Sequence, residues 1–165
     1  MGPLIKYTNR LILRVENESK AKQVLDLYLR NRLPFEQYEP TRPASFYTQD
    51  YHWSSLHREY IAYTMGTFLR YYIYLKDRPD KIIGAINFNI FRTSREPYAE
   101  IGYKIDALYQ NRGIAYEAWR SMYLNMTTRF TASMPASTRK ILRPSHSRRS
   151  LASVHYSLSR KVQTS

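Results

Sequence analysis

Cysteine is absent from the 165-residue chain, which excludes disulfide bonds, thiolate zinc sites and a cysteine nucleophile. Long apolar runs are missing as well, because no window reaches the length that a membrane helix requires. The first residues, MGPLIKYTNR, lack the apolar core of a signal peptide. We therefore expect a cytoplasmic protein with no membrane partner.

Acidic residues are missing from the last part of the chain. All 13 lie at or before Glu117, whereas residues 128–165 hold eight of the 26 basic side chains. The formal net charge is +13. Such a charge favours polyanionic partners such as RNA, because basic groups neutralise phosphates. A mildly basic domain with a solvated tail explains the same pattern.

The remaining composition is that of one folded domain. Apolar residues make up 43% of the chain and aromatic residues 15%, with 16 tyrosines. A chain of this length is expected to form a single core rather than two. We therefore predict one α/β domain.

The N-terminal part predicts a strand followed by a helix. Residues 8–15 (TNRLILRV) alternate well enough for a first strand, with Leu11 and Leu13 on one face. Asn17 or Ser19 can cap a helix with one apolar stripe, and Pro34 is expected to stop it. Residues 35–47 have no regular period and predict a loop, and loops of this length usually serve a site or stay mobile.

A second helix and three strands are expected next. The helix runs from about Thr48 to Thr64 and ends at Gly66. The strands cover residues 68–75, 81–91 and 98–105, and their short turns favour an antiparallel meander. The inward helix positions are predicted to be Trp53, Leu56, Tyr60 and Tyr63 or Thr64. One face of the middle strand is predicted to hold Ile82, Gly84, Ile86, Phe88 and Ile90, opposite the partly polar face with Asn87 and Asn89.

Residues 109–115 (YQNRGIA) join the last of these strands directly to a predicted helix. Its apolar positions have helical spacing: Ala115, Ala118, Trp119, Met122, Tyr123 and Met126. Free amide groups at a helix N-terminus bind phosphate well, and a glycine lets the backbone approach closely. The loop is no Walker motif, because it lacks Gly-Lys-Ser/Thr, and its single glycine excludes a dinucleotide fingerprint. By itself, one glycine before a helix is more often a plain turn.

The loop and the order of the elements together resemble the GNAT superfamily of acyl-CoA N-acyltransferases. Gln110, Gly113 and Ala115 match its Q/R-x-x-G-x-G/A coenzyme A loop. Within the superfamily the chain is most similar to the RimJ/RimL type, the ribosomal-protein N-terminal acetyltransferases. The other matching segments are Thr8-Asn9-Arg10-Leu11-Ile12-Leu13-Arg14, Asn31-Arg32, Tyr38-Glu39-Pro40-Thr41-Arg42, Ile82-Ile83-Gly84 and Ala99-Glu100-Ile101-Gly102-Tyr103.

The resemblance implies a fold and a co-substrate. The fold is α/β (α+β), with a mixed, mostly antiparallel central sheet flanked by helices in the order βααβββα(β). The co-substrate is acetyl-CoA, and no metal is needed. Its pantetheine arm would pair with the backbone of Tyr103, Lys104 and Ile105. Its pyrophosphate would lie on the amides of Gln110, Asn111, Arg112, Gly113, Ile114 and Ala115. The Arg112 side chain either adds phosphate charge or is a solvated arginine.

The implied reaction is direct transfer of acetyl from the thioester to a primary amine, most simply the N-terminus of a ribosomal protein. Backbone amides beside Tyr103 would polarise the thioester carbonyl. Glu100 and Glu39 are the candidate catalytic residues, as base or amine binder. Each has a structural alternative, because Glu100 can pair with an arginine across the sheet and Glu39 can be solvated.

Other functions remain open at this point. The acceptor can be a small amine, such as an antibiotic or polyamine, or the chain can be a non-catalytic RNA or ribosome binder that uses its basic tail. That tail offers only Tyr156 for stacking on bases.

His52 and His57 fit no metal-binding spacing. Several tyrosines could line a peptide groove or belong to the core: Tyr38, Tyr47, Tyr51, Tyr60 and Tyr63.

The resemblance ends after Pro135. Residues 136–165 contain no glycine and no acid, and the N-x-x-S-x-x-L helix and Gly-Phe strand of the family are not found. Such a composition cannot bury enough surface to offset its ordering entropy. We therefore predict a GNAT-like domain over residues 1–135 and a basic Ser/Arg-rich tail, not a native domain, that leaves the C-terminal part of the fold incomplete or disordered. An out-of-frame translation or a truncation is our hypothesis for this tail, and it would impair activity.

Overall fold

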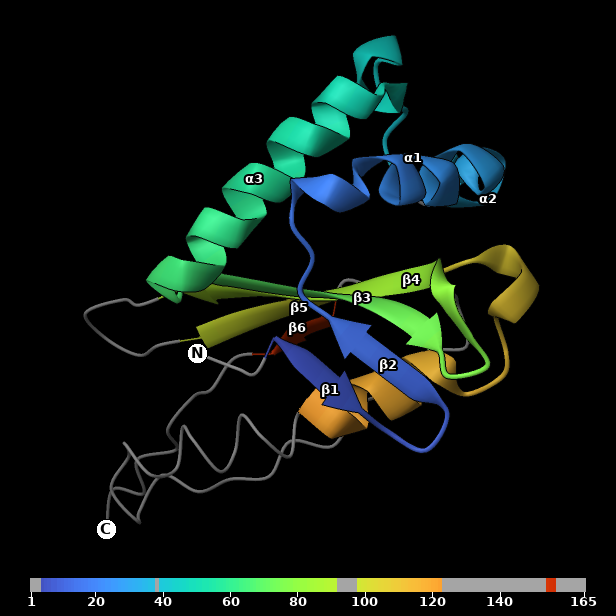
Figure 1. Cartoon of the computed structure of the whole chain (residues 1–165), viewed down its shortest axis with the longest axis vertical. Helices are drawn as coiled ribbons and strands as arrows, with labels where there is room; N and C mark the ends of the chain where they lie inside the picture. The colour runs from blue at the N-terminus through green and yellow to red at the C-terminus, as the bar shows by residue number, and fades with distance from the viewer. Residues whose placement is uncertain (1–3, 38, 92–97, 123–153, 157–165) are drawn as a thin grey trace, which may run out of the picture.

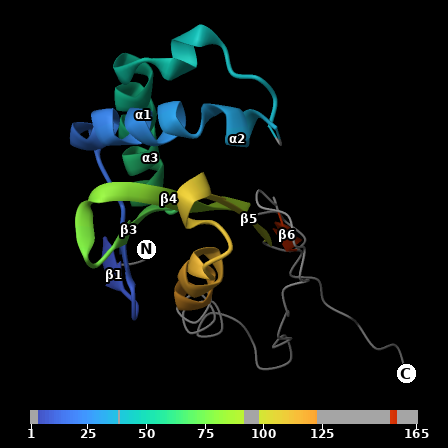
Figure 2. The same ribbon diagram turned by 90° about the vertical axis from the view of Figure 1, so that its right-hand side faces the viewer.

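The computed structural model describes residues 4–37, 39–91, 98–122 and 154–156. These residues form one sheet with helices on both faces (Figures 1 and 2). The strands lie in the order β1-β2-β3-β4-β5-β6, and every neighbouring pair is antiparallel. The mostly antiparallel sheet flanked by helices that the sequence predicts is confirmed.

The elements follow the predicted order with two differences, since an unpredicted strand precedes the first predicted strand and the first helix is broken. The strands are β1 (Ile5–Tyr7), β2 (Leu11–Arg14), β3 (Phe68–Leu75), β4 (Arg78–Phe91), β5 (Tyr98–Ile105) and β6 (Val154–Tyr156). The α-helices are α1 (Ala21–Arg30), α2 (Arg32–Glu36) and α3 (Gln49–Met65), and a further helix runs over residues 114–122. Single-turn 3-10 helices are η1 (Glu18–Lys20), η2 (Ala44–Tyr47) and η3 (Ala107–Tyr109).

Two predictions for the N-terminal part are wrong. The strand predicted over residues 8–15 begins only at Leu11, because the Thr8 hydroxyl accepts the amide of Leu11 at 2.9 Å and closes a turn before it. Pro34 does not stop the first helix but lies inside α2. A proline is tolerated in the first turn of a helix because that turn needs no amide donor. The break between α1 and α2 lies instead at Asn31, whose side chain donates to the Leu27 carbonyl at 2.9 Å.

The termini of α3 are where the sequence predicts them. Thr48 accepts the Tyr51 amide as N-cap, and Gly66 closes the helix with φ of 71°. The inward face is only partly as expected, because Leu56 and Tyr63 are buried but Trp53 and Tyr60 are 49% and 36% exposed. His52, one turn before Leu56, is buried as well.

The middle strand, β4, contains a bulge that the predicted alternation missed. Ile73 pairs with Gly84, whereas the next residue of β3, Tyr74, pairs with Ile82, so β4 carries one extra residue. Ile82 therefore faces the opposite side of the sheet from Ile86.

Each face of the sheet carries an apolar cluster, and the face opposite Ile86 and Phe88 is also partly polar, as predicted, because Asn87 and Asn89 alternate with them along β4. The helix of residues 114–122 covers one face with Ile114, Ala118 and Met122, and α1, α2 and α3 cover the other (Figure 2). Tyr123 and Met126, expected on the same helix, lie outside the described residues.

Only a short piece of the predicted tail belongs to the described part of the chain. Residues 154–156 form β6, in which Val154 pairs with Ile101 and Tyr156 with Ala99. No strand was predicted here, because three residues are too few to show a period. The predicted incomplete or disordered C-terminal part otherwise lies outside the described residues, as does Tyr38.

The imidazole of His52 is a buried group with a strongly shifted pKa. It stacks on Tyr28 with ring centroids 5.2 Å apart, and its Nε2 has no hydrogen-bond partner among the described residues. Burial and the nearby Arg70 charge lower the pKa of His52 to about 4. The unfolded imidazole takes up its proton near pH 6.5. The unfolded chain therefore binds more protons between pH 6.5 and 4, and the free energy of unfolding falls as the pH falls through this window.

Replacing His52 with Phe is expected to remove that part of the acid sensitivity, because no proton is then taken up at this position on unfolding. Urea unfolding at pH 7 and pH 5 measures the effect. His57→Phe is the control, since His57 lies on the same helix with half of its side chain exposed. The prediction would be contradicted if the free energy of unfolding fell by the same amount from pH 7 to pH 5 in His52→Phe and in His57→Phe.

Candidate coenzyme site

The segment between β5 and the helix of residues 114–122 presents free backbone amides. Asn111 and Gly113 have φ of 58° and 71°, and the Gly113 carbonyl accepts the first helical hydrogen bond, from Glu117, at 3.0 Å. Within the described residues, the amides of residues 111–116 donate no hydrogen bond. Unsatisfied amides at a helix start, with the positive end of the helix dipole, attract anions.

Gly113 suits this loop for a conformational and a steric reason. Its φ lies in the left-handed region, which is strained for residues with a side chain. A Cβ built on it would meet only one atom within 4 Å among the described residues, the Arg10 guanidinium at 3.6 Å. The position therefore opens to solvent and leaves the neighbouring amides accessible.

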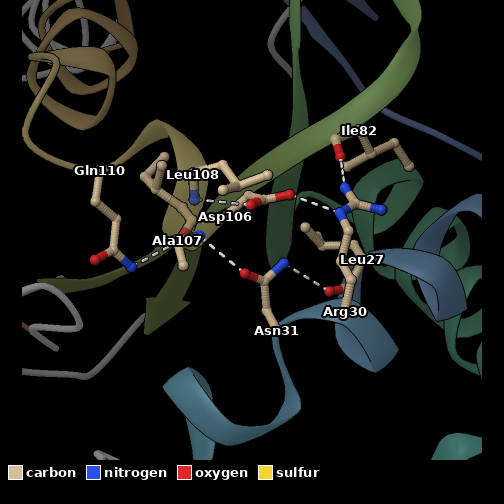
Figure 3. A network of polar contacts seen from close by, with 9 residues as sticks. Leu27, Arg30, Asn31, Ile82, Asp106, Ala107, Leu108 and Gln110 are labelled. Atoms are coloured by element: carbon tan, nitrogen blue, oxygen red, sulfur yellow. Dashed lines mark hydrogen bonds and ion pairs between the residues drawn. The ribbon is translucent and has the colours of Figure 1, made fainter.

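The base of the loop is anchored by a buried polar network (Figure 3). The Asp106 carboxylate, which is buried, accepts Arg30 Nε at 2.6 Å and the Leu108 amide at 3.1 Å. The Asn31 side chain accepts the Ala107 amide at 2.8 Å. Asn31 belongs to a segment that matches the family pattern, but Arg30 and Asp106 were not predicted from the sequence, because no local pattern relates residues 76 positions apart.

The other side of the loop is held by the N-terminal hairpin. The Glu117 carboxylate accepts the Thr8 hydroxyl at 2.5 Å, the Arg10 amide at 2.9 Å and Arg10 Nε at 2.7 Å. A second guanidinium nitrogen of Arg10 donates to the Arg112 carbonyl at 3.0 Å. Burial opposes the ionisation of Glu117, but the hydrogen bonds from Thr8 and Arg10 outweigh it and lower the pKa of this carboxyl.

One edge of β5 has backbone groups that point away from β4. The Asp106 amide donates to the Ile83 carbonyl at 2.9 Å. Carbonyl and following amide point in opposite directions in a trans peptide, so the Ile105 carbonyl faces the other edge. Strand alternation places both backbone groups of Tyr103 on that edge as well. Among the described strands, β6 covers this edge only over residues 99–101.

Gln110 closes the end of this edge. Its side-chain amide donates to the Ile105 carbonyl at 3.1 Å, and its backbone amide donates to Ala107 at 3.4 Å. The side chain of Arg112 is exposed, with its guanidinium 5.6 Å from the centroid of the Tyr109 ring.

Glu39 is paired rather than solvated. Its carboxylate lies 2.6 Å from Lys104 Nζ and 3.1 Å from the Arg42 guanidinium. Burial raises the pKa of Glu39, but Lys104 and Arg42 outweigh this and lower it below the usual value. The Lys104 ammonium also lies 5.1 Å from the Tyr28 ring centroid and 5.5 Å from that of Phe35.

The structure brings Glu39 to the strand that carries Glu100. The backbone of Glu100 pairs with Asn89 of β4 and with His155 of β6, while its side chain lies outside the described residues. Of the tyrosines considered for a groove, Tyr63 is buried, and Tyr51 and Tyr60 are more than a third exposed. Tyr47 donates to Glu36 at 2.7 Å.

Comparison with protein families matches residues 10–152 to the acetyltransferase (GNAT) domain. The chain belongs to this family. The enzyme class and the co-substrate that the sequence predicts are confirmed, because GNAT acetyltransferases use acetyl-CoA. Among the described residues, no group of three His, Cys, Asp or Glu could hold a metal ion, and no helix has the length and apolar composition to span a bilayer.

Solved structures of GNAT acetyltransferases share the fold. The ribosomal-protein-S5-alanine acetyltransferase from Vibrio fischeri has a TM-score of 0.66 at 20% identity, covering 79% of this chain and 69% of that one. RimL, a ribosomal L7/L12 α-N-protein acetyltransferase in complex with coenzyme A, has a TM-score of 0.64 at 22% identity, and the match covers 77% of this chain and 69% of RimL. The microcin C7 self-immunity acetyltransferase MccE, in complex with acetyl-CoA and AMP, has a TM-score of 0.62 at 20% identity, and the match covers 74% of this chain and 65% of MccE. The chain thus spans about two thirds of these proteins. No curated protein sequence matches it.

Proposed function

We propose that this chain transfers the acetyl group of acetyl-CoA to the N-terminal amine of a protein, with a ribosomal protein as the leading acceptor. The observation that carries the proposal is the row of amides over residues 111–116 that donate no hydrogen bond within the described residues, at the start of a helix in a GNAT chain. The similar ribosomal-protein acetyltransferases support the acceptor class.

The coenzyme pyrophosphate is proposed to lie on the loop from Gln110 to Ala115. The free amides begin at Asn111, since the Gln110 amide already donates to Ala107. Gln110 would contribute through its side chain, which fixes the loop to the end of β5. The exposed Arg112 guanidinium adds positive charge at the same place.

The pantetheine arm is proposed to run along the edge of β5 that faces away from β4. Both backbone groups of Tyr103 and the amide of Ile105 point to this edge, where an extended amide-containing arm can pair as an added strand does. The Lys104 backbone pairs with Ala85 of β4 instead, so the expected pairing of the arm with Lys104 is wrong, and the Lys104 side chain binds Glu39. The Tyr103 amide would donate to the thioester oxygen as negative charge develops there.

Glu39 and Glu100 are proposed to have different roles toward the acceptor amine. A carboxylate with a lowered pKa is a weak proton acceptor but binds an ammonium group well, and Glu39 already binds the ammonium of Lys104. We therefore assign amine binding to Glu39 and base action to Glu100. Glu100 takes up one proton of the ammonium group, the neutral amine attacks the thioester carbonyl carbon, and the carbon–sulfur bond breaks. The second proton that the nitrogen loses passes to the departing thiolate, which leaves as coenzyme A.

Acetyl transfer by the purified full chain tests the proposal. Thiol release from acetyl-CoA is followed with peptides that carry a ribosomal-protein N-terminus, and in parallel with spermidine and an aminoglycoside. We expect turnover with peptides and little with the small amines. Turnover with small amines alone would replace the acceptor class, and the similarity to MccE makes this the second candidate. Absence of both turnover and coenzyme A binding would overturn the proposal.

A further inference from the structure

Arg10 joins two parts of the coenzyme loop that are far from it in the sequence. It lies in the turn between β1 and β2, and its guanidinium bridges the Glu117 carboxylate and the Arg112 carbonyl at 2.7 Å and 3.0 Å. Its third nitrogen lies 3.6 Å from the point where a Cβ of Gly113 would be. Because Glu117 compensates its charge, the importance of Arg10 lies in where it holds the backbone.

The hydrogen bond to the Arg112 carbonyl fixes the orientation of a peptide group. Carbonyl and amide of a trans peptide point in opposite directions, so the Gly113 amide points away from Arg10. Glycine accepts both signs of φ at little cost, so the peptide between Arg112 and Gly113 can rotate unless it is held. A rotated peptide would present a carbonyl oxygen where the amide now lies, and that oxygen repels phosphate.

We propose that Arg10 is a positioning residue for the coenzyme, which holds the peptide between Arg112 and Gly113 with its amide toward the pyrophosphate. This inference rests on the proposed function, since it concerns the same loop. Glu117 and Thr8 hold Arg10 in turn, through the Glu117 carboxylate.

The test compares two acetyl donors, acetyl-CoA and acetyl-pantetheine, of which only the first carries a pyrophosphate. In Arg10→Gln, the KM for acetyl-CoA is expected to rise roughly tenfold, as for loss of a charged hydrogen bond. The KM for acetyl-pantetheine and both kcat values should stay unchanged. Arg58→Gln is the matched control, because Arg58 is an exposed arginine of α3. Thermal unfolding of each variant is recorded in parallel.

Arg10→Lys separates geometry from charge. A lysine keeps the charge but lacks the planar fork that reaches two acceptors at once, so we expect it to behave like Arg10→Gln. If Arg10→Gln does not fold, Glu117→Gln, which loosens the guanidinium, must raise the KM for acetyl-CoA selectively. Equal KM changes for both donors, or an acetyl-CoA KM like that of Arg58→Gln, would overturn the inference. A wild-type chain that binds no coenzyme A would instead overturn the proposed function itself.

Discussion

Gly113→Trp is expected to abolish coenzyme A binding while the chain stays folded. The indole would project into the open space beside the free amides, where Gly113 meets only Arg10 among the described residues. The left-handed φ of 71° adds about 1–2 kcal/mol of backbone strain, too little to unfold a typical domain. Calorimetric titration should show affinity for coenzyme A reduced by roughly a hundredfold or more, equivalent to about 3 kcal/mol.

Two further variants show what causes that loss. Gly113→Ala carries the backbone strain without the bulk, so its affinity should fall far less. Met65→Trp adds an indole at a residue that is 71% exposed at the end of α3, and it should bind coenzyme A as the wild type does. If Gly113→Trp retained its affinity with an unchanged melting curve, the pyrophosphate would have to bind elsewhere.

Local patterns in the sequence predict the parts of the fold that depend on neighbouring residues. The ends of α3 follow from Thr48 and Gly66, because capping is decided within one turn. The strands β3 and β5 have the predicted bounds. The loop around Gly113 could be located because its match to the family pattern lies within a few residues.

Long-range contacts explain most of what the sequence did not predict. Arg10 and Glu117 are separated by 107 positions, and Glu39 and Lys104 by 65, so no spacing rule relates them. The bulge in β4 arises from pairing with β3, which alternation within one strand does not reveal.

The domain boundary at residue 135 stays a proposal. The family match extends to residue 152, and β6 lies beyond it, paired with β5 over residues 99–101. Among the described strands, none pairs with the following residues of β5 on that edge, where the pantetheine arm is proposed to lie. An RNA contact through the basic tail has no support from the similar proteins.

Asp106→Ala is expected to be the most destabilising substitution near the site. It removes the buried partner of Arg30 and the acceptor for the Leu108 amide. Arg30 also donates to the Ile82 carbonyl and is only 28% exposed, so its charge is left largely unpaired. Loss of one partner of a buried ion pair costs about 3–5 kcal/mol, and the lower end applies here because water reaches part of Arg30.

A double-mutant cycle shows how much of that cost comes from the pair. Arg30→Met with Asp106→Ala should be less destabilising than the sum of the single variants, because no unpaired charge remains. The i,i+4 pair Arg32 and Glu36, 3.3 Å apart with the Arg32 side chain half exposed, is the matched control, and its coupling energy should be only about 0.3–0.5 kcal/mol. Urea unfolding followed by tryptophan fluorescence measures all variants.

The same network connects stability to the coenzyme loop, which decides how Asp106→Asn should behave. An asparagine keeps an oxygen acceptor for the Leu108 amide but loses the charge that holds Arg30. The hydrogen bond to Leu108 would remain while the ion pair to Arg30 of α1 is lost. The free energy of unfolding should therefore fall more than the affinity for coenzyme A. Equal stability of Asp106→Asn and the wild type would mean that the Arg30 ion pair contributes little, and that the Asn31 contact to Ala107 anchors the loop instead.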